Sequence, residues 1–230
     1  LLEAAQRHCL QEVLVIVSAL SIQDPRERPI ERQQAADEAH RRFVHPESDF
    51  WAFINLWTYF ETQRQTLPSR QIRKFCSSNF LSYMRMREWR EVHRQLLLLC
   101  HELKLPLNQE PASYEEVHMA VLSGFLSQVA WRMDDGTYLG ARTRKYVVFP
   151  GSVLHKKPVR WLVSAELVET SQLFARMNAK VEPEWIEKQA GHLLRREYAE
   201  PHWEQKQGRV IGFEKVLLYG LALVEKRKIN

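Results

Sequence analysis

Positive side chains dominate one short stretch of this 230-residue chain, with no acidic residue among them. The stretch holds six cations: Arg142, Arg144, Lys145, Lys156, Lys157 and Arg160. Aromatic residues flank or separate these cations: Tyr138, Tyr146, Phe149 and Trp161. Guanidinium and ammonium groups hold phosphates, and aromatic rings stack on bases, so the pattern fits single-stranded nucleic acid. Composition alone leaves open an ordinary solvated basic edge.

The positive charge is concentrated in the second half of the chain. Residues 1–125 hold 15 Lys and Arg against 16 Asp and Glu, a net charge of −1. Residues 126–230 hold 18 against 12, a net charge of +6. A chain of this length can form one large domain or two small ones, and the uneven charge favours two.

Two adjacent acids suggest a different chemistry, metal-assisted nucleotide hydrolysis. Asp37-Glu38-Ala39-His40 has the acidic pair that could hold Mg²⁺. Such a pair works at the end of a buried apolar strand, beside a glycine-rich loop that binds phosphates. Here polar residues 31–36 precede it, and no Gly-Lys-Ser/Thr loop occurs. We therefore interpret the tetrapeptide as part of a solvated helix.

Other catalytic and metal-binding patterns are equally weak. The nine histidines form no His-Glu-x-x-His motif, and the three cysteines form no paired CxxC. Ser152 lies in a Pro-Gly-Ser-Val run, which lacks the nucleophile elbow G-x-S-x-G. Cys9, Cys76 and Cys100 are best interpreted as small core residues, and a reducing, cytoplasmic location is expected.

A second cluster of arginines lies in the first half. Residues 70–94 carry a net charge of +5, and Arg87, Arg90 and Arg94 share one ridge if the segment is helical. An ordinary surface helix with Glu/Arg ion pairs and no binding role would show the same pattern. The functional interpretation is a helix that faces nucleic acid or docks on a partner domain.

The elements that position these residues change in character along the chain. Helical spacing predicts helices over 12–21, 31–43, 48–65, 68–77, 83–103 and 113–126. In the fifth of these the expected buried stripe is Trp89, Val92, Leu96, Leu99 and Leu103. Ser48 or Asp49 can cap the third helix, and Ser113 with Glu116 forms a capping box.

Beyond residue 126 the period of the apolar residues becomes two. Strands are expected over 127–133, 137–141, 146–149, 159–168 and 173–181, followed by a short helix from Pro183. Five short strands favour a small OB-type barrel. Residues 209–219 and 221–226 are expected to form a C-terminal β-hairpin around Gly220. The fold class is therefore α+β, with an all-α bundle before the barrel.

Several segments resemble one known family along nearly the whole chain. They are SALSIQDPRERP (18–29), SDFWAFINLWTYFETQ (48–63), FCSSNFLSYMRMREWREVHRQL (75–96), LSGFLSQVA (122–130), VFPGSVLHKKP (148–158) and WLVSAELVETSQLFA (161–175). In this order they resemble the C-terminal region of bacterial DEAH-box ATP-dependent RNA helicases. Each segment alone is weak, but their collinear order is specific.

The resemblance implies an architecture and a role. It implies a helicase-associated, ratchet-like bundle over 1–125, an OB-fold over 126–204 and the start of a further C-terminal region over 205–230. The RecA-like domains, with ATP, Mg²⁺ and the 3′–5′ unwinding activity, would lie in the rest of a longer protein. This chain would then need no cofactor and would be inactive alone.

The resemblance also implies RNA-binding positions. On the barrel these are Arg142, Arg144, Lys145, Ser152, His155, Lys156 and Lys157, and on the long helix Arg85, Arg87 and Arg90. The expected partners are single-stranded RNA and the RecA-like and winged-helix domains of the same longer protein, with no membrane. Tyr138 is a possible base-stacking residue, although a core role fits it equally well.

Two rival interpretations remain at this point. The basic surface could instead dock a protein cofactor, as the OB region does in related helicases. The chain could also be an independent enzyme that uses Asp37–His40, but the absent phosphate-binding loop argues against this.

Overall fold

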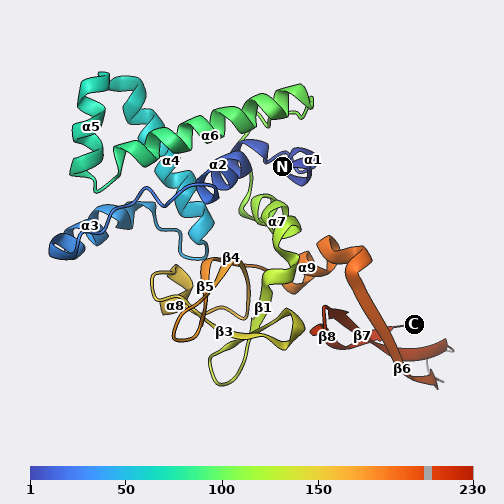
Figure 1. The fold of residues 1–230 in the computed structure, drawn as a ribbon. Coiled ribbons are helices and arrows are strands. Elements are labelled where there is room, and N and C mark those ends of the chain that lie inside the picture. Colours follow the sequence, from blue (N-terminus) through green and yellow to red (C-terminus); the bar gives the residue numbers. More distant parts are fainter. Residues whose placement is uncertain (205–208, 230) are drawn as a thin grey trace. The chain divides into compact units, whose positions relative to one another are not determined.

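The computed structural model describes residues 1–204 and 209–229, which form two compact units that divide between Val121 and Leu122. The first unit is helical and the second consists mainly of β-strands, as the ribbon shows (Figure 1). The predicted α+β class, with helices first, is confirmed. The expected domain limits at residues 125 and 204 stay predictions.

Seven α-helices and two 3₁₀ turns make up the described part of the first unit. They are α1 (Leu2–Gln6), α2 (Leu10–Leu20), η1 (Ile30–Arg32), α3 (Gln33–His40), η2 (Arg41–Phe43), α4 (Asp49–Thr66), α5 (Ser69–Ser78), α6 (Tyr83–Glu102) and α7 (Tyr114–Phe125). The last residues of α7 run into the second unit. Pro25 and Pro29 lie between α2 and α3, where their missing amide protons cost no helical hydrogen bond.

The core of the bundle forms around α2, which packs against α4 and α6. Trp89 of α6 is fully buried, and its indole Nε1 donates to Ser18 Oγ at 2.9 Å and to the Val15 carbonyl at 3.2 Å. Its ring meets Phe53 edge to face and lies 5.0 Å from Trp57. The predicted burial of Trp89 is therefore confirmed, with its one polar atom satisfied.

The predicted stripe of α6 is only partly correct. Met86, Trp89 and Cys100 are buried, whereas Leu99 and Leu103 are 46% and 56% exposed. Burial continues to the C-terminal end of α6, but there it lies on the face of Cys100, which is 1% exposed. Met86, Trp89 and Cys100 lie on one face at helical spacing, and Leu99 and Leu103 lie beside this face rather than on it.

Polar contacts fix the starts of α4 and α7. Ser48 Oγ accepts from the Trp51 amide at 3.1 Å, which confirms Ser48 as the cap of α4. Ser48 also donates to Nε2 of His118 at 2.7 Å, because Nδ1 of that imidazole must donate to the Tyr114 carbonyl. The capping box is confirmed too, since Ser113 and Glu116 each bind the other's amide.

The barrel of the second unit has five strands in the order β1-β2-β3-β5-β4, closed by pairing of β1 with β4. The strands are β1 (Val129–Arg132), β2 (Tyr138–Gly140), β3 (Lys145–Val148), β4 (Trp161–Glu169) and β5 (Leu173–Lys180). The short elements between and after them are η3 (Leu126–Gln128), η4 (Ala141–Thr143), α8 (Val153–Lys156), α9 (Pro183–Ala190) and η5 (Gly191–Leu193). All pairs are antiparallel except β3 with β5, and this arrangement agrees with the predicted OB-type barrel.

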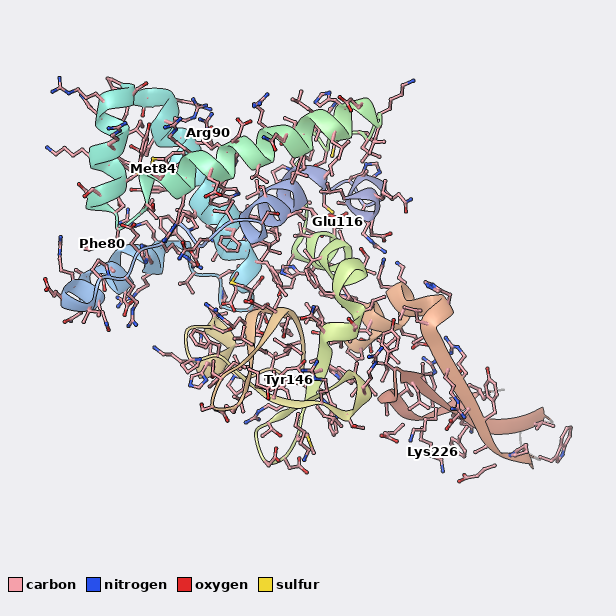
Figure 2. All side chains as sticks on the ribbon, viewed as in Figure 1. Phe80, Met84, Arg90, Glu116, Tyr146 and Lys226 are labelled. Atoms are coloured by element: carbon pink, nitrogen blue, oxygen red, sulfur yellow. The ribbon has the colours of Figure 1, made fainter. Side chains whose placement is uncertain are left out.

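Alternation along the strands fills the barrel. Tyr138, Tyr146 and Val148 point into one cluster with Leu154 of α8 and Leu162 of β4. The labelled Tyr146 lies among the barrel strands in Figure 2. Gly140 allows this packing, since a Cβ there would lie 2.8 Å from the Tyr146 ring.

The C-terminal part differs from the expected hairpin by one strand. A three-stranded antiparallel sheet forms from β6 (Leu194–Glu204), β7 (Arg209–Leu218) and β8 (Leu221–Ile229). The hairpin β7–β8 was predicted, but β6, which pairs with β7, was not. Charged residues and Pro201 hide the alternation of β6, and its register shifts between Ala199 and His202.

Four charged side chains join this sheet to α9. Arg196 of β6 and Arg227 of β8 each contact both Glu187 of α9 and Glu214 of β7. The N–O distances lie between 2.5 and 2.9 Å. Hydrogen bonds from Arg196 and Arg227 hold the pKa of Glu214 below its ordinary value, so this mostly buried carboxylate stays charged.

Candidate nucleic-acid interface

The six cations of 142–160 come from the turns that link the barrel strands. Arg142 lies in η4, Arg144 precedes β3 and Lys145 is its first residue. Lys156 is the last residue of α8, Lys157 follows it, and Arg160 precedes β4. All six side chains are exposed. None of them forms an ion pair with any residue that the structure describes. Their charge is therefore available to a ligand.

Ser152 and His155 differ from the cations around them. Ser152 is 6% exposed, and its Oγ accepts from the Leu154 amide at 3.3 Å, which caps α8. This hydroxyl has a structural task, and little of it can reach RNA. His155 is exposed, and its Nδ1 lies 3.3 Å from the Val148 carbonyl. Because a carbonyl only accepts, Nδ1 carries the proton in this contact, and Nε2 is an acceptor in the neutral form of the ring.

The aromatic residues of the stretch divide between the core and the surface. Tyr138 is 2% exposed and its hydroxyl donates to the Val159 carbonyl at 2.7 Å, so the suggested base-stacking role is wrong. Phe149 is 37% exposed, meets Phe174 edge to face and lies 5.0 Å from the Arg176 guanidinium. The sequence placed it among the aromatic residues suited to nucleic acid but did not single it out, although its place two residues after Val147 is consistent with an outward ring.

The arginines of α6 already have partners within the bundle. Arg85 donates to the Asp24 carbonyl at 3.1 Å, and Arg90 pairs with Glu61 of α4 at 2.7 Å. Arg87 is exposed and lies 5.9 Å from the ring of Tyr83. Figure 2 labels Arg90 on this helix. These three residues belong to the first unit, whereas the barrel cations belong to the second.

A groove of about 940 Å³ runs along α4 and α6 beside these arginines. Its charged walls are balanced: Arg87, Arg90, Arg94, Glu61, Glu88 and Glu91. Trp57 and His93 also line it, and their ring centroids are 4.5 Å apart. Equal numbers of acids and bases give little net attraction for a polyanion.

Asp37 and Glu38 lie on the exposed helix α3 and face no nucleotide site. Asp37 pairs with Arg28 at 2.7 Å, Glu38 pairs with Arg41 at 2.8 Å, and His40 Nε2 contacts the Phe80 carbonyl at 3.0 Å. Across residues 1–204 and 209–229, no group of three or more His, Cys, Asp or Glu could hold a metal ion. The interpretation of this tetrapeptide as part of a solvated helix agrees with these contacts.

Two further features concern membrane-spanning helices and cysteine reactivity. Among the helices of the described residues, none has the length and apolar character needed to cross a bilayer. Cys9, Cys76 and Cys100 are free and buried, and burial raises the pKa of Cys9 to about 12 and of Cys76 to about 11. Such thiols are poor nucleophiles.

Comparison with known families agrees with the fold. Residues 117–193 match the oligonucleotide/oligosaccharide-binding (OB)-fold family, and residues 1–53 match the ratchet-like helicase associated domain, HA2. The chain therefore carries a segment similar to the HA2 domain, followed by a segment similar to the OB-fold.

Individual relatives show more closely which proteins the chain is similar to. The chain is 50% identical over 230 residues to ATP-dependent RNA helicase HrpA of Escherichia coli K12 and 48% identical over 231 residues to the HrpA homologue of Haemophilus influenzae. It is 27% identical over 188 residues to the pre-mRNA-splicing factor prp22 of Schizosaccharomyces pombe, also an ATP-dependent RNA helicase. The chain corresponds to the C-terminal HA2 and OB-fold region of HrpA-type helicases and spans 18% of the length of the two bacterial relatives.

Proposed function

We propose that this chain is the accessory region of a DEAH-box RNA helicase and that its barrel binds single-stranded RNA through the phosphate backbone. The observation that carries the proposal is the set of six exposed cations without an ion pair among the described residues. The relatives are ATP-dependent RNA helicases, and ATP hydrolysis and 3′–5′ unwinding would belong to RecA-like domains in the rest of a longer protein.

The roles within this face follow from the contacts. Lys145, Lys156 and Lys157 would hold phosphates, and Nε2 of His155 could accept from a ribose hydroxyl. Contacts of this type position RNA without reading its bases. Arg85 and Arg90 would act mainly inside the bundle, since each already has a partner there. Arg87 keeps the most freedom of the three.

The test is a salt series of RNA binding by fluorescence anisotropy. Replacing Lys145, Lys156 and Lys157 with Ala should lower the log–log slope by about 2, since each phosphate contact on a single strand contributes ~0.7. Poly-U and mixed sequences should lose affinity equally, because the lost contacts carry no base information. The matched control replaces Arg70, Lys74 and Lys188, which are exposed, lie outside the barrel and have no ion pair among the described residues.

An unchanged slope in the lysine variant, or an equal fall in the control, would reject the RNA face. A protein-docking function would then remain, and it has an observation of its own. The distal part of the C-terminal sheet exposes Tyr198 by 66%, Trp203 by 60% and Val210 by 53%. Exposed aromatic residues of this kind are enriched at protein interfaces.

A further inference from the structure

A cavity of about 550 Å³ opens in the second unit, beside the turn of residues 141–144. Its walls include Gln128, Arg142, Arg144, Tyr146, Glu166 and Tyr219. Two of the barrel's unpaired cations thus line the same hollow as a tyrosine of the C-terminal sheet. A volume of this size lies within the roughly 300–1,000 Å³ that is typical of small-ligand sites.

The turn that presents the two arginines is strained. Arg142 and Thr143 have φ of +55° and +58°, a region that residues with a Cβ rarely adopt. Consecutive residues of this kind persist only where the surroundings hold them, and they cluster at binding sites. Here the Arg142 amide donates to the Tyr219 carbonyl at 3.1 Å and the Arg144 amide donates to the Ala141 carbonyl at 3.3 Å.

Tyr219 reaches the cavity from the turn between β7 and β8. Tyr219 and Gly220 form a two-residue loop with φ of +49° and +85°, as a type I′ hairpin turn requires. Asn is the favoured residue at this first position, so the turn itself does not explain a tyrosine. The Tyr219 side chain is nevertheless partly accessible, because the residue is 38% exposed.

The charge of the cavity favours an anionic ligand. Arg142 and Arg144 have no ion pair among the described residues, whereas Glu166 faces Arg176 at 3.9 Å. Glu166 is the one acid among the described lining residues, and Arg176 partly compensates it. The walls therefore carry a net positive charge, and two tyrosines, Tyr146 and Tyr219, are among the lining residues.

We propose that this cavity receives one nucleotide of the bound RNA, with its base stacked on Tyr219 and its phosphate held by Arg142 and Arg144. The proposal rests on the RNA-binding function of the barrel proposed above. A ring and two cations are the combination that sequence-tolerant single-strand binders use, since every base has a face that can stack. The C-terminal sheet thereby contributes a contact residue to the barrel's interface.

The test uses the whole 230-residue chain with a single-stranded oligouridylate. Tyr219→Asn removes the ring but keeps a residue suited to positive φ, so the turn and its carbonyl remain. Binding should weaken about 5- to 30-fold, in the range expected for one lost base stack. Tyr219→Phe keeps the ring and should bind within about twofold of the unchanged protein.

A mutant cycle connects the ring to one base. An abasic nucleotide, scanned along the oligonucleotide, should at one position weaken the unchanged protein by the same factor as Tyr219→Asn. At that position it should weaken the Tyr219→Asn variant no further. Additive losses at every position would overturn the proposal, because they would mean that ring and base act independently.

The lysine variant separates this proposal from the function on which it rests. If the salt slope falls by about 2 in the Lys145, Lys156 and Lys157 variant while Tyr219→Asn binds normally, the RNA face stands and the nucleotide cavity is rejected. If neither variant changes binding, both are rejected. If the lysine variant and Tyr219→Asn both weaken RNA binding while Tyr219→Phe does not, the RNA face and the nucleotide cavity are both supported.

Discussion

The arginines of α6 and the cations of the barrel have similar charge in the sequence but different surroundings in the structure. Arg85 and Arg90 contact the Asp24 carbonyl and Glu61, and the adjacent groove balances three arginines with three glutamates. The barrel cations at 142–160 are exposed and have no ion pair among the described residues. A count of charges therefore does not locate an interface until partners are known, because a paired cation attracts RNA much less.

The largest expected effect tests the bundle as a scaffold. Trp89→Ala should lower the free energy of unfolding by roughly 3–5 kcal/mol, because it removes a fully buried ring and its two hydrogen bonds. The salt slope of RNA binding should not change, since the barrel cations lie in the other unit. Chemical denaturation and anisotropy measure the two quantities. A stability loss below about 1 kcal/mol would contradict this account of α6.

Acid should weaken the same bundle through His118. Burial lowers the pKa of His118 to about 4, while the hydrogen bond to the Tyr114 carbonyl opposes the shift. The folded imidazole stays neutral where the unfolded one takes up a proton, so stability falls as pH falls from about 6.5 to 4. The loss should approach roughly 3 kcal/mol.

The control for this pH dependence is His118→Gln, which cannot titrate. Denaturation curves at several pH values should show a shallower acid loss for the variant. Some loss should remain, because burial also lowers the pKa of His40, His45 and His93. An equally steep loss in the variant would mean that His118 does not cause it.

The smallest expected effect directly tests the difference between the α6 arginines and the barrel cations. Replacing Arg87 and Arg90 with Gln should change RNA affinity by less than about twofold and leave the salt slope unaltered, because their groove is charge-balanced. The measurement is the same salt series that is used for the barrel lysines. A fall in slope of ~0.7 per arginine would place α6 in the RNA interface and remove the distinction between the two regions.

Local patterns predicted most of the fold. Ser48 and the pair Ser113–Glu116 begin helices because their side chains satisfy free amides, and alternation located all five barrel strands. Local patterns failed where the outcome depends on distant partners. Leu99 and Leu103 are exposed because the buried face of α6 passes through Cys100 instead, and β6 was missed because its pattern is interrupted.

The candidate site shows the same limit. The cations at 142–160 were recognised from their types alone, and the outward ring of Phe149 follows from alternation. Tyr219 could not be connected to Arg142 from the sequence, since 77 positions separate them and only the barrel and sheet bring them together. Ser152 was expected to bind RNA, but its side chain caps α8.

The four-membered ion-pair network of Glu187, Arg196, Glu214 and Arg227 has an evolutionary consequence. Each of the two acids meets both arginines, so replacing an arginine leaves an uncompensated acid, and replacing an acid leaves an uncompensated arginine. A lone partly buried charge is strongly destabilising, while removal of a whole set can be nearly neutral. These positions are therefore constrained as a group rather than one by one, and a lineage that loses the network must exchange several of its members in concert.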